Sequence, residues 1–128
     1  MATIKTLSFK EACEKTGNHP VKSLPYSKPA NTDEEAYNAL KRLEIYAEAY
    51  NMQGKKKWVP KYSNIDQAKW RIWFIWDKAL SAFRFGNTHY DYTDAFTATG
   101  SRHVFRTDAI AEHVATAHID EWNKWLVK

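Results

Sequence analysis

Cysteine is almost absent from this sequence of 128 residues, in which Cys13 is the single example. One cysteine excludes an intrachain disulfide and a zinc site built from several thiolates. Secreted domains of this size more often carry paired cysteines, and the N-terminal residues lack the apolar stretch of a signal peptide. We therefore expect a cytoplasmic protein.

Long apolar runs are missing as well. The longest apolar cluster, residues 70–76, is interrupted by Arg71. It is much shorter than the roughly 18 apolar residues that a membrane helix requires. The sequence therefore predicts no membrane partner.

The sequence also lacks the short motifs of the common enzyme classes. It contains no G-x-S-x-G, no phosphate-loop lysine motif and no G-x-G-x-x-G. Cys13 has no histidine close in sequence that could activate a thiolate, and the paired acids Glu34 and Glu35 suit the first turn of a helix. We predict a protein that is not an enzyme and carries no cofactor.

Aromatic residues, in contrast, are abundant. Six Trp, seven Tyr and six Phe make up 15% of the chain. Each can bury on the order of 150–250 Å², so a few of them supply much of a core. We expect one domain over residues 1–128. Periodicity assigns a core position to each of five tryptophans: Trp70, Trp73, Trp76, Trp122 and Trp125.

Capping signals divide the N-terminal half. Ser8 and Glu11 form a capping box for a short helix that Gly17 ends. Residues 18–31 hold three of the four prolines and predict an extended connector. Thr32 and Glu35 read as a second capping box, and apolar residues at helical spacing predict a long helix over residues 32–52.

Strand signals follow in the C-terminal half. Residues 70–76 predict a central strand covered on both sides, residues 81–85 a second strand and residues 103–106 a last one, while residues 90–96 either pair weakly or form a loop. Thr107 then caps a final long helix. The predicted fold is α+β: an antiparallel meander of three or four strands, two long helices on one face and a short N-terminal helix. Residues 32–128 form its α-β-β-β-α core.

From Trp58 onward the chain resembles a family of small, uncharacterised proteins from bacteriophages and mobile elements of gut Bacteroidetes. The resemblance rests on Trp58-Val59-Pro60, aromatic strands at residues 69–74 and 82–85, Gly100-Ser101-Arg102 and Val104-Phe105, and a helix with Ala111-Glu112. It covers about two thirds of the chain, and a helix like residues 40–51 precedes it. It implies a phage setting and an α+β fold, with no assigned activity and no site. His118 departs from the pattern, in which we expect an aromatic residue.

Positive charge gathers in residues 55–71, where six basic residues accompany a single acid, Asp66. Cations that alternate with aromatics can neutralise phosphates and stack on bases. The candidate nucleic-acid-binding residues are Lys55, Lys56, Lys57, Trp58, Lys61, Tyr62, Lys69 and Arg71. The alternative is a solvated loop after the helix, in which Trp58 plugs the core.

Two further clusters invite weaker hypotheses. His89, Asp91 and Asp94 could hold a divalent metal, or they could be turn-forming acids beside a surface histidine. Ser101 and Arg102 could form an anion nest, or a plain β-turn. His118 falls on the apolar stripe of the last helix and is expected to be a core histidine with a satisfied hydrogen bond.

The sequence thus leaves two main functions open, with a metal-dependent enzyme that uses His89, Asp91 and Asp94 as a third hypothesis. The first is a small accessory protein of a phage or mobile element that binds nucleic acid through residues 55–71. The second is a protein–protein module, either a virion or assembly component or an inhibitor of a host protein, because Trp and Tyr are frequent interface anchors. The first places the protein in the bacterial host cytoplasm, the second also in the virion.

Overall fold

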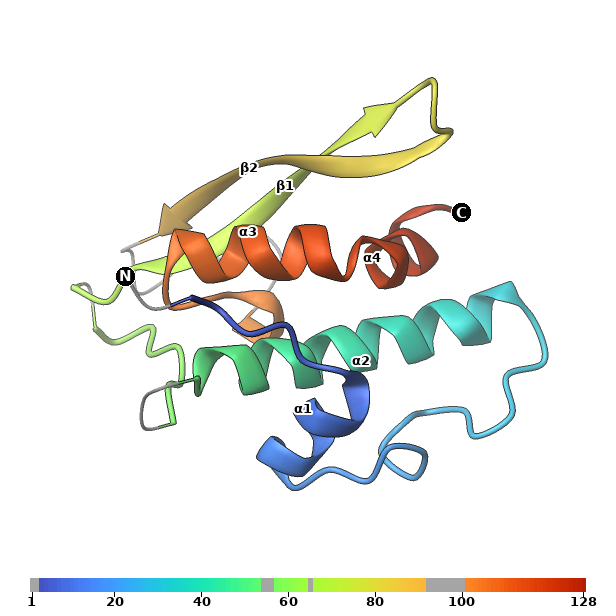
Figure 1. Ribbon diagram of the computed structural model, residues 1–128, viewed down its shortest axis with the longest axis horizontal. Helices are drawn as coiled ribbons and strands as arrows, with labels where there is room; N and C mark the ends of the chain where they lie inside the picture. Colours follow the sequence, from blue (N-terminus) through green and yellow to red (C-terminus); the bar gives the residue numbers. More distant parts are fainter. Residues whose placement is uncertain (1–2, 54–56, 65, 92–100) are drawn as a thin grey trace.

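A computed structural model describes residues 3–53, 57–64, 66–91 and 101–128. Its elements are α1 (Phe9–Thr16), α2 (Thr32–Asn51), β1 (Lys69–Asp77), β2 (Ala82–Asp91), the 3-10 helix η1 (Ser101–His103), α3 (Asp108–Ala117) and α4 (Ile119–Leu126). The fold is α+β. Figure 1 shows the β1–β2 hairpin lying across α3 and α4, with α2 beneath them and α1 on the far side of α2. Within these ranges, no helix has the length and apolar character needed to cross a membrane.

The two N-terminal helices begin at side-chain caps. Ser8 and Glu11 form the predicted capping box, and Gly17 ends α1 with a φ of 74°, which glycine adopts without strain. The start of α2 differs from the prediction, because Asn31 is the residue whose side chain accepts from the Glu34 backbone N–H. Thr32 is already the first residue of the helix.

The core lies where α2 meets the other helices. Tyr50 of α2 is fully buried, as are Phe105 and Val114. Trp122 of α4 is nearly so, and its indole N–H donates to the Val114 carbonyl at 3.2 Å. Because these side chains come from α2, α3, α4 and the segment before α3, the helices share one core.

The predicted meander of three or four strands is not found, because the described residues form a sheet of two strands only. Strand β2 is longer than predicted and includes Tyr90, whereas residues 92–96 lie outside the described part. The strand expected at residues 103–106 reduces to a single bridge, in which Trp70 and Phe105 exchange two backbone hydrogen bonds of 2.8 Å. The Asn51 amide binds the Val104 carbonyl and the Arg106 N–H, so these groups are unavailable to a further strand.

The final helix is also shorter than predicted. It breaks at His118, whose φ of −117° and ψ of 31° are not helical, and this leaves α2 with 20 residues as the long helix among those described. The His118 ring stacks on Tyr46 with centroids 3.9 Å apart and its Nε2 lies 2.8 Å from the Tyr50 hydroxyl. These contacts turn the backbone, and α4 starts again from the His118 carbonyl.

Three of the five tryptophans predicted for the core are exposed instead. Trp122 is buried and Trp70 partly buried, but Trp73, Trp76 and Trp125 expose between 38% and 52% of their surface. Trp73 is exposed because helices cover one face of the hairpin, whereas the prediction assumed cover on both. Trp76 lies next to the end of β1 and Trp125 next to the end of α4. The exposed Trp73 makes the sheet the candidate functional surface.

Candidate interaction surface

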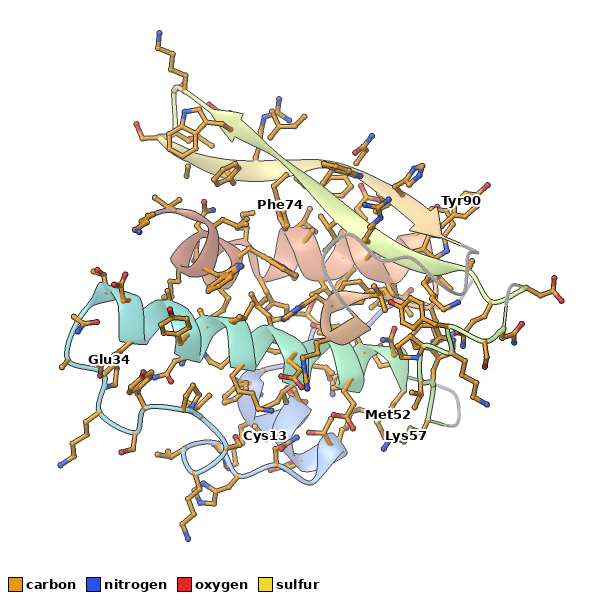
Figure 2. The ribbon with its side chains drawn as sticks, turned by 180° about the vertical axis from the view of Figure 1, so that it is seen from behind. Cys13, Glu34, Met52, Lys57, Phe74 and Tyr90 are labelled. Atoms are coloured by element: carbon orange, nitrogen blue, oxygen red, sulfur yellow. The ribbon has the colours of Figure 1, made fainter. Side chains whose placement is uncertain are left out.

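The hairpin has a packed face and an open face. Trp70, Ile72 and Phe74 pack against the core, and the Phe74 ring lies 5.0 Å from that of Trp122. Figure 2 shows Phe74 between the hairpin and the helices. Because successive strand residues point to opposite faces, the residues between them point away from the helices. Trp73 and Ile75 are accordingly 52% and 46% exposed.

Strand β2 completes this open face. Its cross-strand pairs are Arg71 with His89, Trp73 with Asn87 and Ile75 with Arg84. We call these six residues the outer hairpin face. The pairing shifts by one residue between Trp73 and Phe74, where Gly86 forms a bulge.

Gly86 lets the two strands approach closely at the bulge. A Cβ atom at this position would lie 2.7 Å from Cγ1 of Ile75 and 2.8 Å from the Trp73 carbonyl oxygen. Glycine is therefore required here for steric reasons. The Ile75 side chain reaches across the bulge onto β2, next to the exposed Trp73.

A cationic side chain packs on the exposed indole, and a second lies further along the face. The Arg71 guanidinium carbon lies 5.6 Å from the Trp73 ring centroid, a cation–π distance. Arg84 is about half exposed, and its Nε lies 3.4 Å from Asp77. On the helical side, Arg42 lies 2.9 Å from Glu35 and 2.7 Å from Glu121.

A loop folds over the base of the outer hairpin face and is fastened by Lys69. This side chain is 1% exposed, and its Nζ donates to the carbonyls of Asn64 at 3.3 Å and Gln67 at 2.9 Å. The same ammonium lies 5.1 Å from the Tyr62 ring centroid. Lys69 thus has a structural role, because its charge and donors are used inside the chain.

The predicted segment 55–71 therefore does not form one exposed surface. Lys55 and Lys56 lie outside the described residues. Lys57, near the end of α2 (Figure 2), lies 3.8 Å from Glu48, and Trp58 is half-buried. Lys61 is exposed, but Tyr62 has a buried hydroxyl. Arg71 belongs to the outer hairpin face, so the segment and this face meet at that residue.

The two weaker hypotheses fare differently. Arg102 lies 2.5 Å from a carboxylate oxygen of Glu44, so an anion at this position would compete with an existing ion pair. His89 and Asp91 both lie on β2, two residues apart, but Asp94 is outside the described residues. Within residues 3–53, 57–64, 66–91 and 101–128, no group of three or more His, Cys, Asp or Glu side chains could hold a metal ion.

A buried Tyr–His cluster ties the N-terminal segment to the core. The Tyr50 hydroxyl accepts from the Leu7 N–H at 2.8 Å and lies 2.8 Å from Nε2 of His118. His118 thus has the predicted hydrogen bond, although it is partly buried and not fully inside the core. Burial, helped by the neighbouring His113, lowers the pKa of His118 to about 4. Burial also raises the pKa of Tyr46 to about 12. Both side chains are therefore neutral near pH 7 and act in packing.

A second aromatic surface lies at the other end of α2. Tyr37 is half exposed, and its ring centroid lies 6.4 Å from that of Tyr26 and 6.1 Å from that of Trp125. Tyr37 and Trp125 line a hollow of about 580 Å³. We call these three residues the tyrosine surface. Sequence reasoning missed it, because its members come from a connector and two helices far apart in the chain.

Comparisons with known proteins complete the description of the site. No family model, no curated protein and no solved structure matches the chain.

Proposed function

We propose that this protein is a binding protein, not an enzyme, and that its outer hairpin face binds single-stranded nucleic acid. The observation that carries the proposal is the half-exposed Trp73 with Arg71 against its ring and Arg84 close by on β2. An exposed indole can stack on a base for on the order of 1–3 kcal/mol, and arginines neutralise phosphates. The proposal keeps the predicted ligand and moves its site from residues 55–71 to the sheet.

The chemistry at the centre of this face favours unpaired bases over a duplex. Trp73 and Ile75 offer apolar surface, which suits the flat face of an unstacked base. Reading a duplex through its major groove relies mainly on polar side chains that bond to base edges. Lys61, in the loop at the base of the hairpin, is an exposed cation that can extend the contact to a neighbouring phosphate.

We place the protein in the setting that the resemblance implies, as an accessory protein of a phage or mobile element in the bacterial host cytoplasm. Its ligand would then be a single-stranded intermediate of phage or host nucleic acid. Charge supports such a ligand, because the chain carries a net +4, and two of its helical acids, Glu35 and Glu121, are ion-paired with Arg42.

Fluorescence anisotropy with a labelled oligothymidylate at low and at moderate salt tests the proposal. Trp73→Ala should weaken binding about five-fold or more. Arg84→Ala should weaken it and reduce the slope of log K against log salt by about one. Trp125→Ala, which removes another exposed indole on the helical side, is the matched control and should bind as the unchanged protein does. Absence of binding by the unchanged protein at low salt would refute the proposal.

A protein–protein module is the second candidate, and the tyrosine surface favours it. Tyr and Trp are enriched among interface anchors, and here two of them line a hollow beside Lys124 and Asp33. This role would suit a virion or assembly component, or an inhibitor of a host protein. A pull-down from host lysate should then lose its captured protein on Tyr37→Ala and keep it on Trp73→Ala. The opposite pattern would contradict this second candidate.

A further inference from the structure

Among the described residues, the edge of β1 that faces away from β2 has a backbone partner only at Trp70. Trp70 directs both its N–H and its C=O to this edge, where they pair with Phe105. Peptide groups of a strand alternate in direction, so every second residue along β1 directs its groups to the same side. The extra residue of the bulge, Gly86, is in β2, so the alternation in β1 is unbroken. Ile72, Phe74 and Trp76 therefore point their N–H and C=O groups outward.

The described residues provide no backbone partner for these three residues on that edge. Helix α4 contacts β2, and α3 lies under the packed face. The outer edge of β2 is treated differently, because the Asn123 amide binds both backbone groups of Phe83. An apolar strand with an open edge readily pairs with another strand.

The sequence of β1 is complementary to itself in the antiparallel direction. When residues 71–77 are paired with the same segment reversed, Arg71 faces Asp77, Ile72 faces Trp76, Trp73 faces Ile75 and Phe74 faces Phe74. An aromatic then faces a β-branched residue in each pair between the ends and the centre. At the ends, Arg71 and Asp77 carry opposite charges, and Asp77 also lies 3.4 Å from Arg84 of its own chain. Such cross-strand pairs stabilise a sheet, whereas like charges directly opposite would oppose the pairing.

We propose that a second copy of this chain pairs with the open edge of β1, antiparallel and centred on Phe74. In this register Ile72 of one copy pairs with Trp76 of the other, and Phe74 with Phe74. Each of these pairs can exchange two hydrogen bonds, because all three residues direct both groups outward. A shift by two residues either way leaves one of the three without a pair, and one of the shifts also requires the edge of Trp70, which Phe105 occupies.

The product is a four-stranded sheet with the order β2-β1-β1-β2. Its outer surface joins two copies of the outer hairpin face, so that Trp73 of one copy lies beside Ile75 of the other. The pairing uses backbone groups and does not depend on the proposed binding of nucleic acid. It would nevertheless double the platform on which a single strand could lie.

Light scattering coupled to size-exclusion chromatography, without nucleic acid, tests the dimer. The unchanged chain should show twice its mass of 14.9 kDa at tens of micromolar and approach 14.9 kDa on dilution. Trp76→Pro should be monomeric, because proline lacks the outward N–H while no bond to β2 is lost. Trp76→Ala removes the same indole but keeps the N–H, and it should still dimerise. Monomer mass for the unchanged chain at several hundred micromolar, or equal masses for the two variants, would overturn the proposal.

Amide hydrogen exchange provides a second reading that needs no substitution. The N–H groups of Ile72, Phe74 and Trp76 should exchange more slowly as protein concentration rises, whereas those of Trp73 and Ile75, which point to β2, should not change with concentration. Protection of the three outward amides that is independent of concentration would show that this chain covers its own edge and would overturn the dimer. Because neither experiment includes nucleic acid, their failure would leave the proposed function standing.

Discussion

The side-chain amide of Asn123 binds both backbone groups of Phe83, with the Phe83 N–H donating to Oδ1 at 2.7 Å and Nδ2 donating to the Phe83 carbonyl at 2.9 Å. Asn38 repeats this arrangement with Tyr26, at 3.0 and 2.8 Å. Asn51 does so with the two residues that flank Phe105. In each case an asparagine side chain on a helix binds a backbone N–H and a backbone C=O of a non-helical segment. It thereby makes the hydrogen bonds that a neighbouring strand would otherwise make.

Replacing Asn123 by Ala should therefore release the hairpin from α4. Two hydrogen bonds are lost and both Phe83 groups lose their partner, so the free energy of unfolding should fall by about 1–3 kcal/mol. Urea denaturation followed by tryptophan fluorescence measures this change. Asn123→Asp is the matched control, because it can still accept from the Phe83 N–H but cannot donate, and it should lose less. Equal stability of Asn123→Ala and the unchanged protein would contradict the role assigned to this contact.

Adding one methyl group at the bulge tests the close approach of the strands. Gly86→Ala places a Cβ within 3 Å of both Ile75 and the Trp73 carbonyl, and overpacking of this kind costs about 1–3 kcal/mol. Thermal unfolding monitored by circular dichroism reports the loss. The double variant Ile75→Ala, Gly86→Ala should recover part of it, since the side-chain clash is gone while the carbonyl remains. Full stability of the single variant would mean that the strands are further apart than described.

Lys69 should matter for stability where Lys61 does not. Lys69→Met keeps the length of the side chain but removes the donors to the carbonyls of Asn64 and Gln67, so we expect a loss of about 1–2 kcal/mol. Lys61→Met changes an exposed cation in the same loop and should stay within about 0.5 kcal/mol of the unchanged protein. Urea denaturation of the two variants side by side makes the comparison. Similar values would contradict the fastening role of Lys69.

Stability should fall in mild acid because of three partly buried histidines. The pKa of His118 is about 4 in the folded chain and near 6.5 when unfolded, so the unfolded chain binds the proton first as pH falls. The stability that neutral His118 contributes is fully present above pH 6.5 and is lost as the pH drops towards 4. The free energy of unfolding should then fall by about 1–2 kcal/mol, once the partial exposure of His118 is allowed for. Burial lowers the pKa of His103 and His113 too, which adds to the loss.

Denaturation midpoints measured from pH 7 to pH 4 test this dependence. His118→Gln keeps a polar group that can reach Tyr50 but does not titrate, so its midpoints should vary less with pH than those of the unchanged protein. The same change at His113, which is less buried, should remove a smaller part of the slope. An unaltered slope in His118→Gln would show that other groups control the acid response.

Local signals predicted the helical half of the fold well. The Ser8–Glu11 box, the stop at Gly17 and the apolar periodicity of residues 32–52 each act within a few residues, so they can be recognised from sequence. The strand count could not be predicted in this way. Whether residues 103–106 pair depends on Asn51, more than fifty residues earlier, whose amide takes two of their backbone groups.

The exposed surface of the sheet could not be predicted for a related reason. Strand propensity identified residues 70–76, but it could not show that helices cover one face only, so Trp73 was assigned to the core. Residues 55–71 are rich in basic side chains, but composition does not show which of them are exposed. Lys69 is buried, because its ammonium donates to two carbonyls of its own loop. Exposure depends on tertiary packing, which no local pattern encodes.

The most direct test of the central claim is a nuclear magnetic resonance titration of the labelled protein with an oligothymidylate at low salt. We predict that the indole N–H of Trp73 and the amides of Arg71, Arg84 and His89 shift, while Tyr37 and the indole N–H of Trp125 do not. Shifts confined to the tyrosine surface or to residues 57–64, or no shifts at all, would contradict the assignment of the outer hairpin face as the nucleic-acid site.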